Sequence, residues 1–79
     1  MNNNFLKVSL MCEKLNGILS KLDKPLVWSA KEESGVISLS QHDKKRQVTQ
    51  TVLRECTANE SFLFLKGYYL AIRNLSMSV

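Results

Sequence analysis

A β-hairpin is predicted by the sequence LVWSAKEESGVISLS, residues 26–40. Apolar and polar residues alternate through 26–33 and again through 36–40, which is the period of strands that bury one face. Ser34-Gly35 marks the turn between them, because glycine readily adopts the positive φ of a tight hairpin. Two antiparallel strands are therefore expected, with Trp28 as the anchor of the core beneath them.

A long amphipathic helix is predicted before the hairpin, over residues 4–22. Its apolar side chains recur at the three- and four-residue spacing of one helical stripe. Pro25 ends the helix, since proline disfavours helical geometry in the residue before it. The stripe consists of Val8, Met11, Cys12, Leu15, Ile18, Leu19 and Leu22.

The chain after the hairpin predicts a third strand and a second helix. Residues 42–46 form a charged connection, and 47–56 is rich in the Thr and Val that favour strands. One side of a short helix is the alternative for 47–56, but a third strand completes a meander more simply. Thr57-Ala58-Asn59-Glu60 is a capping box that starts a helix running to about residue 76. Its expected core stripe is Phe62, Leu65, Tyr69 and Ile72, flanked by Tyr68 and Leu75.

The predicted order is α-β-β-β-α in one domain, residues 1–79, because a chain of this length buries a single core. Three antiparallel strands with both helices on one face form a two-layer α+β sandwich. No apolar run approaches the roughly 20 residues of a membrane span, and the N-terminus lacks the features of a secretory signal. We expect a cytoplasmic protein without membrane contact. Cys12 and Cys56 are expected to be reduced thiols, with a disulfide as the alternative.

The second helix carries more apolar residues than its core stripe requires. Leu63, Leu70 and Met77 are spaced by seven residues and point away from that stripe, beside Gly67. Either the two helices bury these side chains between them, or the side chains form an exposed patch. Such a patch would form a homodimer or dock a partner protein.

Two groups of basic residues are candidate binding sites for anions. Eleven Lys and Arg against seven Asp and Glu give the chain a net charge of +4, which suits an anionic partner but also serves solubility. Lys44, Lys45 and Arg46 form a run in a predicted loop, either a solvated turn or a contact to phosphates or an acidic protein. Lys7, Lys14 and Lys21 form a second basic line along the first helix.

Catalysis and metal binding are not expected. His42, the sole histidine, is predicted in a polar loop without an accompanying nucleophile, carboxylate pair or Cys-His signature. A zinc site would have to combine His42 with Cys12 and Cys56 from separate elements and would still lack a fourth Cys or His ligand. No cofactor is expected, because the glycines are isolated and form no phosphate-binding loop.

The element order is similar to that of the double-stranded RNA-binding domain, whose last helix opens with a Lys-Lys-x-x-Lys run. Here that helix opens with Thr57-Ala58-Asn59-Glu60, and the basic run at 44–46 lies one strand too early. Size, element order and the lack of catalytic signatures also resemble small phage-encoded inhibitors of host defence, anti-CRISPR proteins among them. That resemblance implies docking on a host complex such as a nucleoprotein nuclease. Because this chain is basic, an acidic protein surface is the expected partner; a nucleic-acid-binding or regulatory domain is the alternative.

Overall fold

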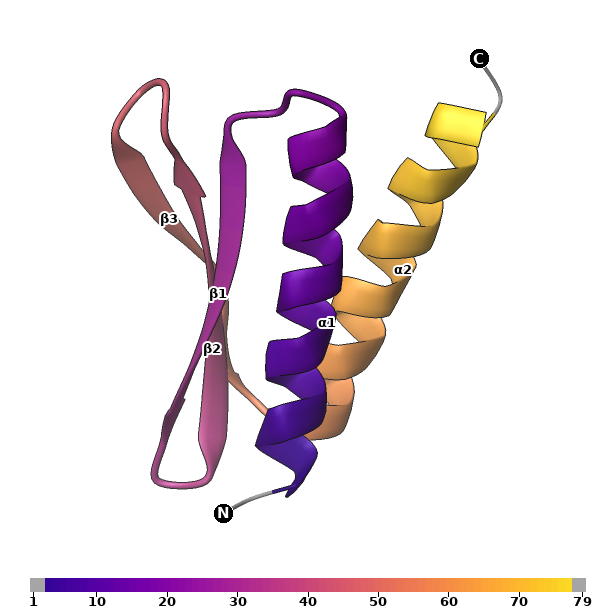
Figure 1. Ribbon diagram of the computed structural model, residues 1–79. Helices are drawn as coiled ribbons and strands as arrows, with labels where there is room; N and C mark the ends of the chain where they lie inside the picture. Colours follow the sequence, from indigo (N-terminus) through magenta and orange to yellow (C-terminus); the bar gives the residue numbers. More distant parts are fainter. Residues whose placement is uncertain (1–2, 78–79) are drawn as a thin grey trace.

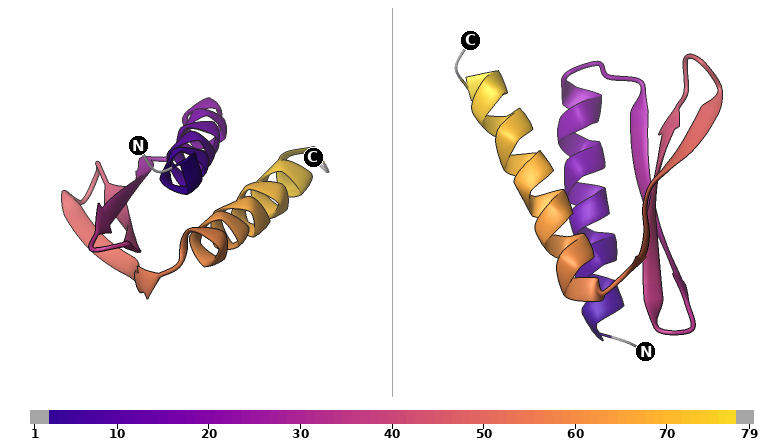
Figure 2. Two further views of the ribbon diagram at one scale, coloured as in Figure 1. Left: turned by 90° about the horizontal axis from the view of Figure 1, so that it is seen from below. Right: turned by 180° about the vertical axis from the view of Figure 1, so that it is seen from behind.

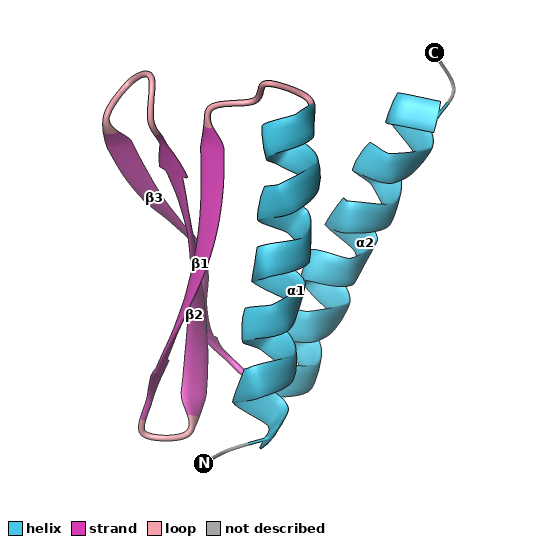
Figure 3. Ribbon diagram, viewed as in Figure 1, coloured by secondary structure: helices cyan, strands magenta, loops and turns pink. Residues whose placement is uncertain are grey.

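The structure, a computed structural model, describes residues 3–77 (Figure 1). Its three strands form one antiparallel sheet in the order β1-β2-β3, and both helices lie on the same side of it (Figure 2). This confirms the predicted α+β order α-β-β-β-α, and the segment for which strand and helix were both considered forms a strand, Val48–Cys56 (Figure 3). The elements are α1 (Asn3–Lys21), β1 (Leu26–Glu33), β2 (Val36–Asp43), β3 (Val48–Cys56) and α2 (Ala58–Met77).

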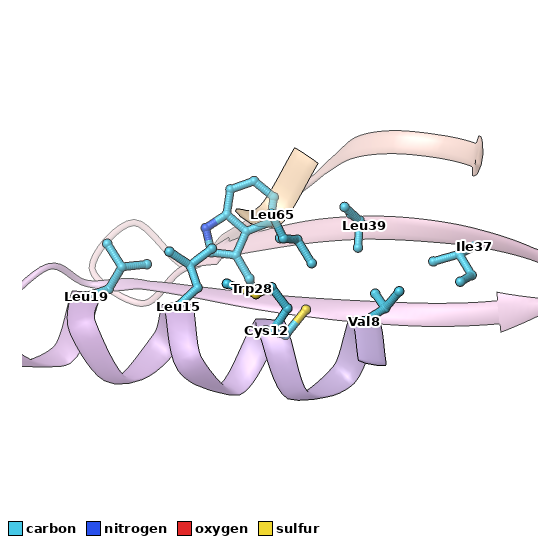
Figure 4. Close-up of a cluster of buried hydrophobic side chains, with 9 residues drawn as sticks. Val8, Cys12, Leu15, Leu19, Trp28, Ile37, Leu39 and Leu65 are labelled. Carbon is cyan, nitrogen blue, oxygen red and sulfur yellow. The ribbon is translucent and has the colours of Figure 1, made fainter. Parts of the chain in front are cut away.

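The core lies between α1 and the sheet. The buried side of α1 meets the apolar faces of β1 and β2, and Leu65 of α2 closes the cluster (Figure 4). Trp28 is 3% exposed and packs its ring against Phe64 and Tyr68, with centroid distances of 5.9 and 5.2 Å. The prediction that Trp28 anchors the core is therefore confirmed. The buried apolar residues are Val8, Met11, Cys12, Leu15, Leu19, Trp28, Ile37, Leu39 and Leu65.

The side chain of Asn16 ties α1 to the edge of the sheet. Its amide nitrogen donates to the carbonyl oxygen of Trp28 at 2.9 Å, and its oxygen accepts the Trp28 backbone N–H at 2.7 Å. β1 is an edge strand, so backbone groups on its outer side have no neighbouring strand to pair with. Asn16 takes the place of that strand at one residue and satisfies both groups.

Both hairpin turns are specified by local chemistry. Ser34 and Gly35 have φ angles of 52° and 82°, as in a two-residue type I′ turn, which confirms the predicted hairpin. In the second turn the carboxylate of Asp43 accepts the backbone N–H groups of Lys45 and Arg46, at 3.0 and 3.1 Å. Such an Asx turn orders the backbone locally.

His42 lies in β2 and not in a loop, so that expectation was wrong. In the register of the sheet it lies between Val27 of β1 and Thr49 of β3. Its ring nitrogen Nδ1 is 2.8 Å from the hydroxyl oxygen of Thr49, a cross-strand hydrogen bond. The strand continues as far as Asp43 because a compact turn of four residues, 44–47, is enough to connect it to β3.

The predicted capping box starts α2. The backbone N–H of Thr57 donates to the Glu60 carboxylate at 2.9 Å, and the N–H of Glu60 donates to the Thr57 hydroxyl at 3.1 Å. Accepting hydrogen bonds stabilises the ionised carboxylate, which lowers the pKa of Glu60. The cap thus stabilises the helix above the ordinary titration range of glutamate and is lost as the pH falls through the lowered pKa.

α2 leans away from the sheet as it proceeds from its N-terminus (Figures 1 and 2). Ser61 and Leu65 are buried near its start, whereas Leu75 near its end is 70% exposed. Of the stripe predicted for this helix, only Leu65 is fully buried, and Phe62, Tyr69 and Ile72 are half-buried. The radius of gyration, 12.7 Å, exceeds the value of about 11.6 Å typical of a compact domain of this length. The second half of α2 therefore projects from the body of the molecule.

We expect Asn16→Ala to lower the free energy of unfolding by about 2 kcal/mol, because it leaves the N–H and C=O of Trp28 unpaired in a partly buried position. Urea unfolding monitored by the fluorescence of Trp28, the single tryptophan, measures the change. Ser20→Ala, at an exposed position of the same helix, is the matched control and should stay within about 0.5 kcal/mol of the wild type. Equal stability of both variants would contradict a structural role for the Asn16 amide.

Gly35→Ala and Gly67→Ala should change stability in opposite directions. A Cβ atom meets no other atom within 4 Å at either position, so only the backbone distinguishes them. At Gly35 the φ of 82° is strained for alanine, and we expect a loss of about 1 kcal/mol. At Gly67, within α2, alanine should add about 0.5 to 1 kcal/mol through its helix propensity. Thermal unfolding measures both, and a loss of stability in Gly67→Ala would contradict the continuous helix at that residue.

Candidate partner-binding site

A groove of about 720 Å³ runs between α1 and α2, and no strand contributes to its lining. We call it the helix groove. Its lining combines apolar and charged side chains. The apolar lining residues, which we call the floor, are Leu10 and Met11 from α1 and Phe62, Tyr69 and Leu70 from α2; the charged lining residues are Lys7, Glu13, Lys14, Lys66 and Arg73.

The cations of the helix groove form two matching pairs. Lys7 and Lys14 on α1 are seven residues apart, and so are Lys66 and Arg73 on α2. Seven residues are almost two helical turns, so each pair lies on one side of its helix with an axial separation of about 10.5 Å. Each helix thus brings two cations to the groove. Among the described residues Glu13 is the one carboxylate in the lining, so positive charge is in excess there.

Aromatic rings in the floor hold three of the ammonium groups over the groove. The Nζ atoms of Lys7 and Lys66 lie 5.7 and 6.0 Å from the ring centroid of Phe62. The Nζ atom of Lys14 lies 5.7 Å from the centroid of Tyr69. Each such cation–π contact contributes about 0.5–1 kcal/mol at an exposed site. The contacts of Lys7 and Lys14 also cross from α1 to α2 and so help to keep the helices in register.

The groove brings together residues that the sequence presented as two separate candidate sets. Leu70 comes from the predicted apolar patch, and Lys7 and Lys14 come from the predicted basic line. Leu63 is 56% exposed but does not line the groove, and neither does Lys21. The predicted site residue Met77 belongs to α2, but its side chain lies outside the part of the chain that the structure describes.

Seven of the ten residues that line the groove were not predicted as site residues, among them two pairs with a seven-residue spacing. Phe62 and Tyr69 were assigned to the core, whereas Lys66 and Arg73 were not singled out. A signal for them is present in the sequence, because each of these two pairs has the same seven-residue spacing as Lys7 and Lys14. Spacing alone does not show that the two helices turn these flanks toward each other, since that depends on how the helices pack.

The basic run at 44–46 lies elsewhere. It forms the turn between β2 and β3, and this turn and α2 lie on opposite sides of the molecule (Figures 1 and 2). All three side chains are exposed. The backbone N–H of Lys44 donates to the carbonyl of Pro25 at 2.7 Å, which fixes the turn against the start of β1. The structure therefore does not unite Lys44, Lys45 and Arg46 with the leucines of α2 in one surface.

A second hollow, of about 560 Å³, opens where α2 leans away from α1 and β1. We call it the apolar wedge. Among the described residues, Lys24 is the one charged residue that lines it. Leu22, predicted on the core-facing stripe of the first helix, is 37% exposed here, and Leu75, predicted to flank the core stripe of the second, is 70% exposed. The apolar lining consists of Leu19, Leu22, Leu26, Tyr68, Ile72 and Leu75.

The candidate catalytic and metal-ligating residues are dispersed. Cys12 is buried in the core, where burial raises its pKa to about 11, so its thiol stays protonated near neutral pH and is a poor nucleophile. Cys56 is half-buried at the end of β3, and both cysteines are free. Over residues 3–77, no three His, Cys, Asp or Glu side chains are grouped so that they could hold a metal ion. No helix within the same range is long and apolar enough to cross a membrane.

Comparison with known proteins yields no relative. No protein-family model matches the chain, and neither a curated protein nor a solved structure matches it. The candidate functional surfaces are therefore those of the chain itself: the helix groove, the apolar wedge and the basic turn.

Proposed function

We propose that this chain is a non-catalytic protein-binding module that docks on an acidic surface of a partner protein through the helix groove. The supporting observation is the combination of an apolar, partly aromatic floor with four cations and one carboxylate in its lining. Buried apolar and aromatic side chains supply most of the energy of a protein interface. Charges at its rim accelerate association and select the partner.

A protein partner fits the floor of the groove better than a nucleic acid does. Leu10 is 54% exposed and Leu70 is 39% exposed, so water now covers apolar side chains that a partner would bury. Nucleic acids are held by contacts to phosphates and by bases stacked on aromatic rings. The exposed apolar side chains of the groove, Leu10 and Leu70, are aliphatic, so a base cannot stack on them, whereas an apolar side chain of a protein can pack against them.

The resemblance to phage-encoded inhibitors of host defence suggests a biological setting. In this proposal the partner is a host protein complex, such as a nucleoprotein nuclease in the host cytoplasm. The inhibitor would act by covering an acidic docking surface, without chemistry. A chain with a cationic groove would compete with any basic protein that binds the same acidic surface, because complementary charge favours both contacts.

Reversing the charge of one groove cation on each helix tests the proposed function. We expect the double variant Lys14→Glu, Lys66→Glu to recover roughly 10- to 100-fold less partner in a tagged pull-down from host lysate. The two new glutamates would repel the acidic surface that the lysines attract. The partner should survive nuclease treatment. Circular dichroism verifies that the variant is folded.

The matched control is Lys44→Glu, Lys45→Glu, which changes the net charge equally but lies in the β2–β3 turn. It should retain the partner. Equal losses in both double variants would show that net charge and not the groove governs binding. Partners that disappear on nuclease treatment, with binding that falls steeply with salt, would favour the nucleic-acid alternative.

We also propose that this chain forms a homodimer through the apolar wedge and not through the helix groove. Four cations of the groove would face four cations of a second copy, whereas the wedge carries only Lys24. The wedge region also presents both a hollow and a projecting side chain, Leu75, as a self-complementary interface with twofold symmetry requires.

Sedimentation velocity over a concentration series tests the dimer. We expect the wild type to self-associate and Leu75→Asp to remain monomeric, because a carboxylate would be buried in the apolar interface. Leu63→Asp places the same charge at an exposed leucine of α2 outside the wedge, and it should behave like the wild type. A wild-type protein that stays monomeric throughout the series would rule out the dimer.

A further inference from the structure

The outer edge of β3 is open along its first residues. β3 is the last strand in the sheet order β1-β2-β3, so within residues 3–77 the backbone groups on its outer side meet no neighbouring strand. The side chains of residues 48–52 are all exposed, so neither helix covers this part of the strand. An edge of this kind is a template on which a further strand can form.

Only the first part of this edge has the regular geometry that strand pairing requires. Residues 48–51 pair with β2 in an unbroken register, from Val48 opposite Asp43 to Thr51 opposite Ser40. Beyond Thr51 the register shifts, and Glu55 has a φ of 52°, as in a bulge that bends the strand. A strand that joins β3 would therefore pair with residues 48–51.

The two edges of the sheet differ in how they are protected. On β1 the Asn16 amide occupies the backbone of Trp28, and the strand ends in the charged residues 31–33. Such features keep a strand from pairing with another chain. Residues 48–53 of β3 contain no proline and no charge, and four of the six are the Val and Thr that favour strands. β3 is thus the edge that can accept a further strand.

Positive charge is concentrated at one end of the open edge. The basic run at 44–46 is exposed in the turn directly before β3, and among the described residues no ion pair engages its side chains. The Asp43 carboxylate accepts two backbone N–H groups of this turn and so orders it. At the other end of β3, Arg54 and Glu55 offset each other in charge. A ligand of this edge is therefore attracted by acidic groups that lie beside the turn.

We infer that the open edge of β3 binds an extended segment of another protein, which adds a fourth strand and carries Asp or Glu beside the basic turn. The sheet is antiparallel throughout, and antiparallel pairing is slightly the more stable kind. A segment antiparallel to residues 48–51 runs toward the turn, so its acidic residues follow the paired ones. Backbone hydrogen bonds hold such a segment, and the charges select it.

This inference goes beyond the proposed function and does not rest on it. No strand lines the helix groove, and the basic turn and α2 lie on opposite sides of the molecule (Figures 1 and 2). The segment at β3 and the partner of the groove would therefore occupy separate surfaces.

A second copy of the chain fits this edge less well than an acidic segment does. If residues 48–51 of two copies paired antiparallel, Lys45 of one copy would lie opposite Arg54 of the other. Of the basic run only Lys44 would meet a carboxylate, that of Glu55. Like charges that lie opposite each other destabilise a strand pair. The occupant we infer is therefore a segment of a different protein.

The probe is a peptide with blocked ends, in which alternating Thr and Val residues are followed by three Glu residues, titrated into the isotope-labelled full chain. We expect the amide signals of residues 48–51 to shift, and the outward amides among them to exchange more slowly with solvent. The same peptide in reverse order has equal charge and should bind roughly tenfold more weakly, because its glutamates lie far from the turn. Equal affinities of the two peptides would overturn the inference.

Two further peptides test whether backbone groups hold the segment. One carries N-methyl groups on all its Thr residues and the other on all its Val residues. Because successive residues of a strand direct their N–H groups to opposite sides, only one of the two sets faces β3. We expect methylation of that set to weaken binding at least roughly tenfold and methylation of the other set to change it little. Equal binding of both methylated peptides would overturn the inference.

Variants of the chain locate the acidic end of the peptide. Lys45→Gln combined with Arg46→Gln should weaken binding roughly three- to tenfold. Lys14→Gln combined with Lys66→Gln removes the same charge from the helix groove and should leave the affinity unchanged. Equal losses would show attraction to net charge and would overturn the inference. Protection of the amides of 48–51 that rises with protein concentration, without peptide, would identify a second copy at the edge and would overturn it as well.

Discussion

The paired hydrogen bonds between the Asn16 amide and the backbone of Trp28 are the constraint on which the arrangement of the helices depends. Apolar contacts alone leave a helix free to slide or to rotate slightly on a sheet, because they have little directionality. Two hydrogen bonds to one residue of β1 fix both its position and its rotation. Once the rotation of α1 is fixed, its lysines at 7 and 14 can lie only on the flank that meets α2.

α2 is held firmly at one end. The capping box and the buried residues Ser61 and Leu65 fix its first turns against the core. Farther along, the helix leaves the sheet, so side chains on two of its flanks stay accessible: Tyr69 in the helix groove and Ile72 in the apolar wedge. A helix that is apolar on several sides usually becomes buried. Here the chain itself buries only the first half, which leaves the second half available to partners.

Local patterns predicted nearly all of the fold, because its elements are specified by short-range chemistry. The apolar stripe of α1, the Ser34-Gly35 turn and the capping box at Thr57 were all predicted, and each depends on neighbouring residues. What was missed depends on contacts between distant parts of the chain. The bond from Asn16 to Trp28 spans 12 residues, and no sequence pattern predicts a side chain that pairs with a strand edge.

The same division applies to the candidate site. Leu70, Lys7 and Lys14 were each identified from spacing, but which surface they share is set by the angle between the helices. The basic run at 44–46 was identified as well, yet the topology of the sheet carries it to the opposite side of the molecule. A pattern in the sequence identifies residues that are suited to a binding surface. It does not show which of them lie side by side in the folded chain.

The positions of the charged residues determine where the net positive charge of the chain can act. The chain has a net charge of +4, and the lining of the helix groove, with four cations and one carboxylate, accounts for most of it. The charges of the remaining residues therefore nearly cancel. The net positive charge is concentrated at the groove and is not spread over the surface as a solubilising charge would be. Aromatic rings hold three of these cations over an apolar floor, where contact with a partner would exclude water and strengthen each attraction.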